Sequence, residues 1–179
     1  MSDQILPTES KSYWRANNDF PLFSKINNNI ETDIVIIGAG LTGITAAYLL
    51  SNSGRKVIVV EGSRILEGTT GFTTAKVTAQ HGPIYQQLIS TFGEEKARLY
   101  YDANTQAKEY IKQTIEQLNI HCDYETMPAY IYADTEVGIE KVEKEMEAYN
   151  TLGIEGASLT KDTGLPYTVK QALKLEDQG

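Results

Sequence analysis

The chain has 179 residues, with 16 Lys or Arg against 24 Asp or Glu, so its formal net charge is −8. Binding to nucleic acid needs basic surface that neutralises phosphates, so this charge argues against a nucleic-acid partner. The length allows one ordinary domain or two small ones. Cys122 is the single cysteine, which excludes intramolecular disulfides and is compatible with a reducing cytoplasm, the compartment that we expect.

Residues 1–32 are mostly polar and are expected to form an N-terminal arm. Asp3 and Glu9 precede any apolar run, so we expect no secretory signal peptide. Several large apolar groups nevertheless predict that the arm docks on the domain that follows, in a structural role. These groups are Tyr13, Trp14, Phe20, Pro21, Leu22 and Phe23.

Two short β-branched runs, at residues 34–37 and 57–60, are typical of fully buried parallel strands. Apolar residues at helical spacing from 44 to 50 predict a helix between them, which ends at Gly54. The window 34–50 is the most apolar of the chain, but glycines and threonines interrupt it. Strand plus helix therefore explains this window better than a membrane span does.

Three glycines, Gly38, Gly40 and Gly43, join the first strand to the helix. In a dinucleotide-binding turn the first allows a tight turn, the second lets backbone approach a pyrophosphate, and the third lets helix and strand pack closely. The helix N-terminus then offers free N–H groups to that pyrophosphate. Glu61 ends the second strand, where a carboxylate accepts a ribose hydroxyl and repels a 2′-phosphate, which favours FAD or NAD over NADP. A glycine triplet also occurs in ordinary turns. The prediction of a dinucleotide-binding site therefore depends on the whole series of strand, glycine turn, helix, strand and Glu61.

The loop at residues 62–76 is rich in glycine, serine and threonine. Such a run can bring backbone amides and hydroxyls close to an extended anion. A helix is predicted to begin within residues 74–81. Gly82 and Pro83 then break the chain and restart it, since proline suits a first helical position.

The longest periodic segment is predicted to begin at a capping box, Thr91 with Glu94. It indicates an amphipathic helix of about seven turns at 3.6 residues each. We interpret its tyrosines as packing residues rather than substrate contacts. The stripe consists of Ala97, Tyr100, Tyr101, Ala107, Ile111, Ile115 and Leu118.

Residues 123–133 alternate like a strand, with Tyr130 and Tyr132 on one face, although Pro128 argues against a regular central strand. Asp134 and Thr135 can cap another helix, which ends at Gly153. Short strands are expected at residues 157–160 and 172–175. The helix is predicted to bury Ile139, Val142, Met146 and Tyr149 and to expose Glu140, Glu143, Glu145 and Glu147.

These elements predict an α/β chain: an arm (1–32), part of a Rossmann-like FAD-binding domain with a βαβ start (33–82), and a helical and α+β part of a substrate domain (83–179). A doubly wound sheet needs more than two parallel strands to bury both faces. Nothing after residue 160 supplies them. We therefore expect the chain to be an N-terminal piece of a larger protein.

The motif set resembles the D-amino-acid-oxidase-like family of FAD-dependent oxidoreductases, and most of all its bacterial members with a C-terminal Rieske iron–sulfur domain. The likeness covers nearly the whole chain, and residues 73–82 carry the most specific part of it. In such relatives a substrate domain interrupts the FAD domain, which C-terminal sequence then completes. The matching segments are 12–14, 33–43, Glu61, 68–71, 73–76, 78–82 and 92–97.

The resemblance implies a set of FAD contacts. Glu61 would hold the adenosine ribose, and Ser63 and Arg64 would lie near the adenosine. Some relatives carry flavin covalently on a histidine of this loop, whereas this chain has Phe72 there, so we expect noncovalent FAD. The pyrophosphate would be held by Gly38, Gly40, Leu41, Thr42 and Gly43, and the way to the flavin would be lined by Thr69, Thr70, Gly71, Thr73 and Thr74.

A Rieske cluster needs two cysteines and two histidines, and the chain offers only Cys122, His81 and His121. Such a cluster could lie only in sequence beyond this chain, and we predict no metal site here. We interpret His121 and Cys122 as a helix-to-strand junction. For His81 a structural hydrogen bond is favoured over a contact with flavin or substrate.

The expected function is the N-terminal portion of an FAD-dependent oxidoreductase that takes hydride from an amine or amino-acid-like substrate. No residue qualifies as a catalytic acid or base. The alternatives are an FAD-binding electron carrier without catalysis and an NAD-dependent dehydrogenase. Alone, the 179-residue chain is expected to be inactive and to hold FAD weakly or not at all. It is expected either to associate with copies of itself through an unpaired strand edge or to fold mainly through its helical half, residues 83–153.

Overall fold

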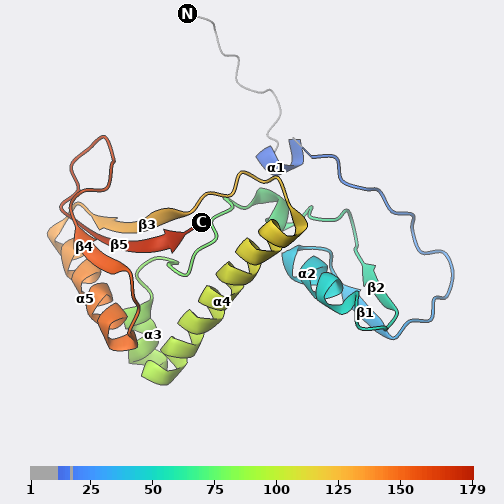
Figure 1. Ribbon diagram of the computed structural model, residues 1–179, viewed down its shortest axis with the longest axis horizontal. Coiled ribbons are helices and arrows are strands. Elements are labelled where there is room, and N and C mark those ends of the chain that lie inside the picture. Colours follow the sequence, from blue (N-terminus) through green and yellow to red (C-terminus); the bar gives the residue numbers. More distant parts are fainter. Residues whose placement is uncertain (1–11, 17) are drawn as a thin grey trace, which may run out of the picture. The chain divides into compact units, whose positions relative to one another are not determined.

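The computed structural model describes residues 12–16 and 18–179, which form two compact units, one ending at Ala75 and the other beginning at Lys76 (Figure 1). Each unit is described by itself. Residues 1–11, and with them the prediction that no signal peptide is present, lie outside the described residues. The predicted domain boundary at residues 82 and 83 stays a prediction, but Val77 and Gly179 exchange backbone hydrogen bonds of 2.7 and 2.9 Å within the second unit.

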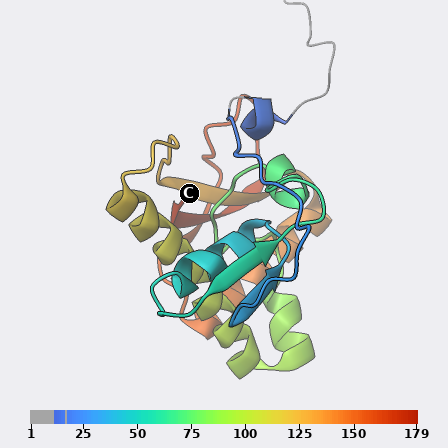
Figure 2. The same cartoon turned by 90° about the vertical axis from the view of Figure 1, so that its right-hand side faces the viewer.

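The first unit contains two parallel strands joined by a helix. Ile34 lies opposite Val57 and Ile37 opposite Val60, so the pairing runs without a shift. The helix α2 packs along both strands (Figure 2). The predicted strands are confirmed, and the helix begins three residues earlier than expected, directly after Gly40. The elements are α1 (Tyr13–Ala16), β1 (Ile34–Ile37), α2 (Leu41–Leu50), β2 (Val57–Val60) and the 3-10 helix η1 (Thr69–Phe72).

The predicted full burial of β1 is wrong for the described residues. Alternate side chains of this strand stay in solvent, with Val35 at 55% and Ile37 at 89% exposure. Side chains of a strand alternate between the two faces of a sheet, and α2 packs along β1 and β2 on one face, so Val35 and Ile37 belong to the other face. Apolar side chains on the remaining surface are therefore left uncovered.

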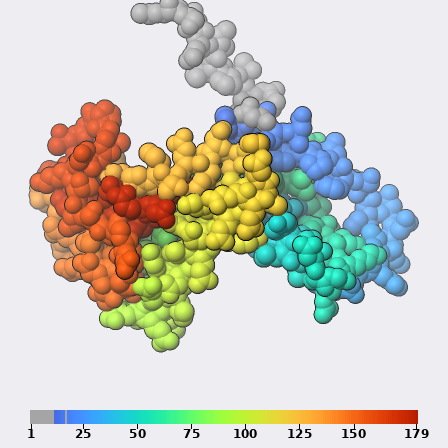
Figure 3. Space-filling model, viewed as in Figure 1, coloured from blue at the N-terminus to red at the C-terminus, as the bar shows by residue number. Residues whose placement is uncertain are grey.

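The N-terminal arm docks only at its beginning. Trp14 and Arg15 on α1 are partly buried against the loop that contains η1. Further along, Leu22 is 79% and Phe23 is 76% exposed, and residues 21–31 lie on the surface (Figure 3, blue). The prediction that the whole apolar group docks is therefore wrong for Tyr13, Pro21, Leu22 and Phe23 in the described chain.

The second unit packs helices against an antiparallel three-stranded sheet in the order β3-β5-β4. The register shifts between Met127 and Ala129, so Pro128 sits at an irregularity of an edge strand, as its missing N–H requires. Neither β4 nor β5 joins β1 and β2, which confirms that these strands do not extend the first sheet. The elements are α3 (Tyr85–Phe92), α4 (Glu94–Leu118), β3 (Met127–Ala133), α5 (Glu136–Leu152), β4 (Ala157–Thr160) and β5 (Gln171–Gln178).

Two helix starts differ from the prediction. Gly93, at φ +84°, separates α3 from α4, so Thr91 lies inside α3 and the predicted capping box is wrong. No helix forms within residues 74–81, because this stretch instead makes hydrogen bonds to the end of β5. Thr135 is confirmed as the N-cap of α5, since its side chain accepts from the N–H of Gly138 at 3.1 Å.

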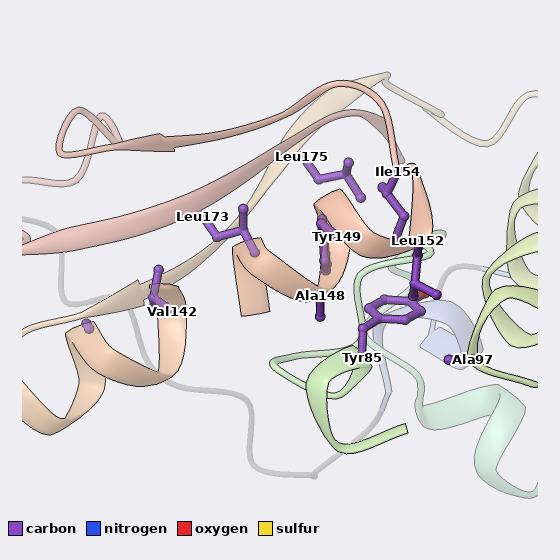
Figure 4. Close-up of a cluster of buried hydrophobic side chains, with 10 residues drawn as sticks. Tyr85, Ala97, Val142, Ala148, Tyr149, Leu152, Ile154, Leu173 and Leu175 are labelled. Atoms are coloured by element: carbon purple, nitrogen blue, oxygen red, sulfur yellow. The ribbon is translucent and has the colours of Figure 1, made fainter. Parts of the chain in front are cut away.

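The core of the second unit lies between α3, α5 and the sheet. Tyr85 from α3 points towards Tyr149 of α5, with ring centroids 5.2 Å apart and an edge-to-face geometry (Figure 4). Leu173 of β5 is fully buried above them. Glu145 was predicted to be solvated, and this is wrong: its side chain is 0% exposed and faces the start of α3.

Among residues 12–16 and 18–179, no helix is both long and apolar enough to cross a membrane. Within the same residues, His, Cys, Asp and Glu side chains form no group of three that could hold a metal ion.

Candidate functional site

The loop between β1 and α2 has a geometry that requires glycine at two positions. Gly38 adopts φ +97°, a conformation that residues with a side chain rarely take. A Cβ on Gly43 would come within 1.9 Å of the Gly38 carbonyl oxygen, so the first turn of α2 sits directly on the loop. A Cβ on Gly40 would meet the Thr70 hydroxyl at 3.3 Å. A side chain at Gly43 would therefore clash with the loop, and one at Gly40 would crowd Thr70.

The N-terminus of α2 presents unpaired donors. Gly40 is the N-cap residue and has no side chain to satisfy them. The Leu41 N–H donates to the Thr70 hydroxyl at 3.0 Å, whereas the N–H groups of Thr42 and Gly43 have no acceptor among the described residues. Such groups, together with the helix dipole, favour an anion at this end of the helix.

The carboxylate of Glu61, just after β2, ties two parts of the site together. One oxygen accepts from the Ala39 N–H at 2.8 Å and the other from the Ser63 N–H at 2.9 Å. These bonds, led by that from Ala39, hold the pKa of Glu61 below its ordinary value of 4.5. The side chain is exposed, so an ionised acceptor stands beside the glycine loop at neutral pH.

Part of the predicted loop closes over the glycine turn. The Leu66 N–H donates to the Ala39 carbonyl at 3.0 Å, and Thr70 of η1 contacts Leu41 as above. Gly71 is buried in the same short helix. The structure thus brings together, by direct contact, the glycine loop, Glu61, Ser63 and Thr70. The side chains of Arg64, Thr69, Thr73 and Thr74 are exposed and make no hydrogen bond to the glycine loop within the described residues.

Sequence reasoning missed the roles of Ala39, Arg15 and Glu67 in this region, whereas it expected Trp14 to dock. Ala39 is 1% exposed and uses both its N–H and its carbonyl to hold neighbouring segments. Trp14, Arg15 and Glu67 form contacts that support η1 from the side of the arm. The pattern gave no signal for the pair of Arg15 and Glu67, because 52 residues separate them.

The predicted junction at His121 and Cys122 is confirmed, whereas the choice between a structural role of His81 and a contact with flavin or substrate stays a prediction. His81 Nε2 lies 3.1 Å from the Asn104 side-chain oxygen, which is a structural hydrogen bond within the second unit. His121 and Cys122 are exposed at the junction between α4 and β3. Neither belongs to a metal-binding group within the described residues.

Comparison with known protein families gives one decisive match. Residues 33–179 match the family of FAD dependent oxidoreductases known as DAO. The chain belongs to this family. Members of the DAO family bind FAD, and the matched range includes the glycine loop, Glu61 and the loop that follows.

Relatives of the chain include proteins with names that point to redox chemistry. The YhfW protein of Bacillus subtilis, named as a Rieske 2Fe-2S iron-sulfur protein, is 42% identical over 99% of this chain and 35% of its own length. A probable oxidoreductase of Haemophilus influenzae, OrdL, is 28% identical over 87% of the chain and 36% of itself. Gamma-glutamylputrescine oxidoreductase of Escherichia coli is 28% identical over 64% of the chain and 27% of itself. The chain thus spans about a third of the length of these relatives.

The residues present fit the dinucleotide of a DAO protein. Gly43 leaves no room for a Cβ, which keeps the helix end close to the loop, and N–H donors remain at that end for a phosphate. Glu61 adds an ionised acceptor of the kind that binds a ribose hydroxyl. Donors for phosphate and an acceptor for sugar therefore lie on one loop system.

Proposed function

We propose that the chain is the N-terminal portion of an oxidoreductase that binds FAD noncovalently and oxidises an amine or amino-acid-like small molecule. The observation that carries the proposal is the contact system of the glycine loop, Glu61 and Thr70, in a chain of the DAO family. The names of relatives support the substrate class, since one is a gamma-glutamylputrescine oxidoreductase and another an L-amino-acid oxidase.

In this proposal the FAD domain is of the Rossmann type. The backbone of the loop and the start of α2 would bind the pyrophosphate, through Gly38, Gly40, Leu41, Thr42 and Gly43. Glu61 would accept a ribose hydroxyl, and Ser63 and Arg64 would lie by the adenosine. Thr69, Thr70, Gly71, Thr73 and Thr74 would border the path towards the flavin, and Phe72 offers no nucleophile for covalent attachment.

FAD, when bound, would supply an acceptor for the hydride that leaves the C–H bond next to the substrate nitrogen, as the C–N bond becomes a C=N bond. The tasks of this chain are to bind and to orient. The N–H donors of the helix end would bind the pyrophosphate, and the carboxylate of Glu61 would accept a ribose hydroxyl, so together they would orient the cofactor on the loop. None of the described residues is assigned as a catalytic acid or base.

The proposal extends to sequence outside this chain. The two-stranded sheet with exposed Val35 and Ile37 supports the view that further strands complete the FAD domain. A Rieske cluster, as the name of YhfW suggests for that protein, would have to be held by other sequence, because the described residues show no metal-binding group. Cys122 is free and exposed, and we place the protein in a reducing cytoplasm.

The test starts with the cofactor. Full-length protein is purified and denatured, and the released compound is identified by mass. FAD is expected, released without proteolysis. NAD instead of FAD would favour a dehydrogenase and contradict the proposal, and flavin that stays on the chain would contradict noncovalent binding.

The second step tests catalysis. The flavin protein is mixed without oxygen with a panel of primary amines, diamine derivatives and amino acids, and flavin absorbance is followed. Bleaching by a member of this panel is expected. If no member of the panel bleaches the flavin, but a reduced partner protein does bleach it, the electron-carrier alternative would be favoured.

A third step tests Glu61 directly. Glu61→Ala deletes a charged acceptor, for which about 1.5–3 kcal/mol is reasonable, so FAD affinity should fall by roughly ten- to a hundredfold. Glu61→Gln keeps the shape and an acceptor oxygen and should lose less. Equal FAD affinity in the wild type and Glu61→Ala would mean that the ribose binds elsewhere.

A further inference from the structure

The short helix α1 makes four different kinds of contact with the loop at residues 67–73. The Trp14 indole N–H donates to the Thr73 carbonyl at 2.8 Å. Arg15 Nη2 lies 2.8 Å from a carboxylate oxygen of Glu67, and both side chains are about 30% exposed, at 28% and 31%. Two adjacent residues thus contact both sides of η1.

The remaining contacts come from the same arginine. Its guanidinium carbon lies 5.7 Å from the centre of the Phe72 ring, in reach of a cation–π interaction. Its aliphatic stem fills the space beside Gly71, where an added Cβ would come within 3.1 Å of the Arg15 Cδ and 2.2 Å of the Leu66 carbonyl. An added Cβ would therefore clash with the Leu66 backbone and would also crowd the Arg15 stem.

The contacts continue from Glu67 and η1 to the glycine loop. The second oxygen of Glu67 accepts from the Ser63 hydroxyl, and this bond, followed by that from Arg15, holds the pKa of Glu67 below its ordinary value. Ser63 is also bonded to Glu61 through its N–H. On the other side of η1, the Thr70 hydroxyl accepts from Leu41 at the start of α2. Arg15 is thus linked through Glu67 and η1 to both ends of the candidate site.

We propose that Trp14 and Arg15 are positioning residues that hold the loop at residues 62–74 against the glycine loop, so that the arm determines how firmly the cofactor is retained. This inference rests on the proposed binding of FAD at that site. The arm would then influence cofactor binding in addition to its packing on η1.

The experiment uses the full-length protein with three variants. Arg15→Leu keeps an apolar stem beside Gly71 but removes the ion pair and the cation–π contact. Arg15→Lys keeps the charge but loses the planar guanidinium. Arg55→Leu makes the same change as the first variant at an exposed position between α2 and β2 of the same unit, and serves as the matched control.

The first readout needs no cofactor. Hydrogen exchange of peptides that cover residues 64–74 is measured in the apoprotein. Arg15→Leu should exchange about three- to tenfold faster there, with Arg15→Lys between it and the wild type and Arg55→Leu unchanged. Unchanged exchange in Arg15→Leu would overturn the proposal, because the loop would then be ordered without the arm.

The second readout is FAD affinity by titration of the apoprotein. Arg15→Leu should bind about three- to tenfold more weakly, since the ion pair is partly exposed and worth less than a buried one. If hydrogen exchange rises in Arg15→Leu while its FAD affinity equals that of the wild type, the proposed link between the arm and cofactor retention would be overturned. A wild type that binds no FAD would refute the proposed function instead, and the exchange result would still decide whether Arg15 holds the loop.

A fourth variant separates the two positioning residues. Trp14→Phe keeps an aromatic ring but deletes the indole N–H that bonds the Thr73 carbonyl. In Trp14→Phe, hydrogen exchange should rise more in residues 72–74 than in residues 64–67. In Arg15→Leu, it should rise in both segments. Identical exchange in Trp14→Phe and the wild type would remove Trp14 from the proposal.

Discussion

The buried carboxylate of Glu145, on α5, accepts a hydrogen bond of 2.8 Å from the backbone N–H of Tyr85, the first residue of α3. Its other oxygen accepts from the N–H of Gln86 at 3.0 Å. The first N–H groups of a helix have no partner within it, so a side chain from another helix caps α3 here. The contact joins α3 to α5 in the middle of the core.

We predict that Glu145→Ala destabilises the second unit by about 2–4 kcal/mol, because two N–H donors lose their acceptor in a dry core. Urea unfolding followed by circular dichroism measures the effect. Glu143→Ala, two residues away on the exposed face of α5, should change stability by less than about 0.5 kcal/mol. Equal stability of Glu145→Ala and Glu143→Ala would show that α3 needs no cap.

The same carboxylate predicts a dependence on pH. Burial raises the pKa of Glu145 above its ordinary value of 4.5, although the bonds from Gln86 and Tyr85 oppose this. The unfolded chain releases the proton first as pH rises, so the contribution of this group is full below pH 4.5 and falls as pH rises towards the folded pKa.

Glu145→Gln isolates this contribution, since glutamine does not titrate. The stability difference between wild type and Glu145→Gln should shrink with rising pH above 4.5, by at most about 1.4 kcal/mol per pH unit. Urea unfolding of both proteins between acidic and neutral pH measures it. A difference that grows with pH would mean that the hydrogen bonds outweigh burial.

Sequence patterns predicted the first unit well where local chemistry decides the structure. The β-branched runs at 34–37 and 57–60 became strands, and the glycine at position 43 became the point where α2 meets the loop. Thr135 could be predicted as an N-cap because its side chain accepts a hydrogen bond from the N–H of Gly138, only three residues away. Such signals are contained within a few neighbouring residues.

Other features depend on distant parts of the chain and gave weaker signals. The pair of Arg15 and Glu67 could not be seen, because nothing near either residue specifies the other. Glu145 could have been found: residues 142, 145, 149 and 152 share one face of α5, and the other three are apolar and buried. The capping box at Thr91 failed because Gly93, at positive φ, begins a new helix two residues later.

Gly43→Ala should lower the free energy of unfolding of the first unit by about 1–3 kcal/mol. The reason is that the added Cβ would lie 1.9 Å from the Gly38 carbonyl oxygen, so the backbone must shift. Hydrogen exchange of peptides that span residues 34–60 measures this. Gly62→Ala is the control, since a Cβ there meets nothing within 4 Å. Equal protection in Gly43→Ala and Gly62→Ala would contradict the close packing of loop and helix.

The 179-residue chain, prepared by itself, is predicted to associate with copies of itself and to have no oxidoreductase turnover. Exposed Val35 and Ile37 stand on a narrow sheet with open edges, which favours pairing with another chain. Light scattering over a range of concentrations measures the mass. Ile37→Lys should reduce association, whereas Ile120→Lys, in the second unit, should not. A monodisperse monomer that turns over substrate would refute this prediction.

The most direct test of FAD binding at the glycine loop is a titration of full-length apoprotein with FAD, in the wild type and in Gly40→Ala and Gly40→Val. A Cβ at position 40 already meets the Thr70 hydroxyl at 3.3 Å, and valine adds two methyl groups on the face that a pyrophosphate would approach. The account predicts stoichiometric binding in the wild type, weaker binding in Gly40→Ala and none in Gly40→Val, with all three folded by circular dichroism. Full flavin occupancy in Gly40→Val would contradict it.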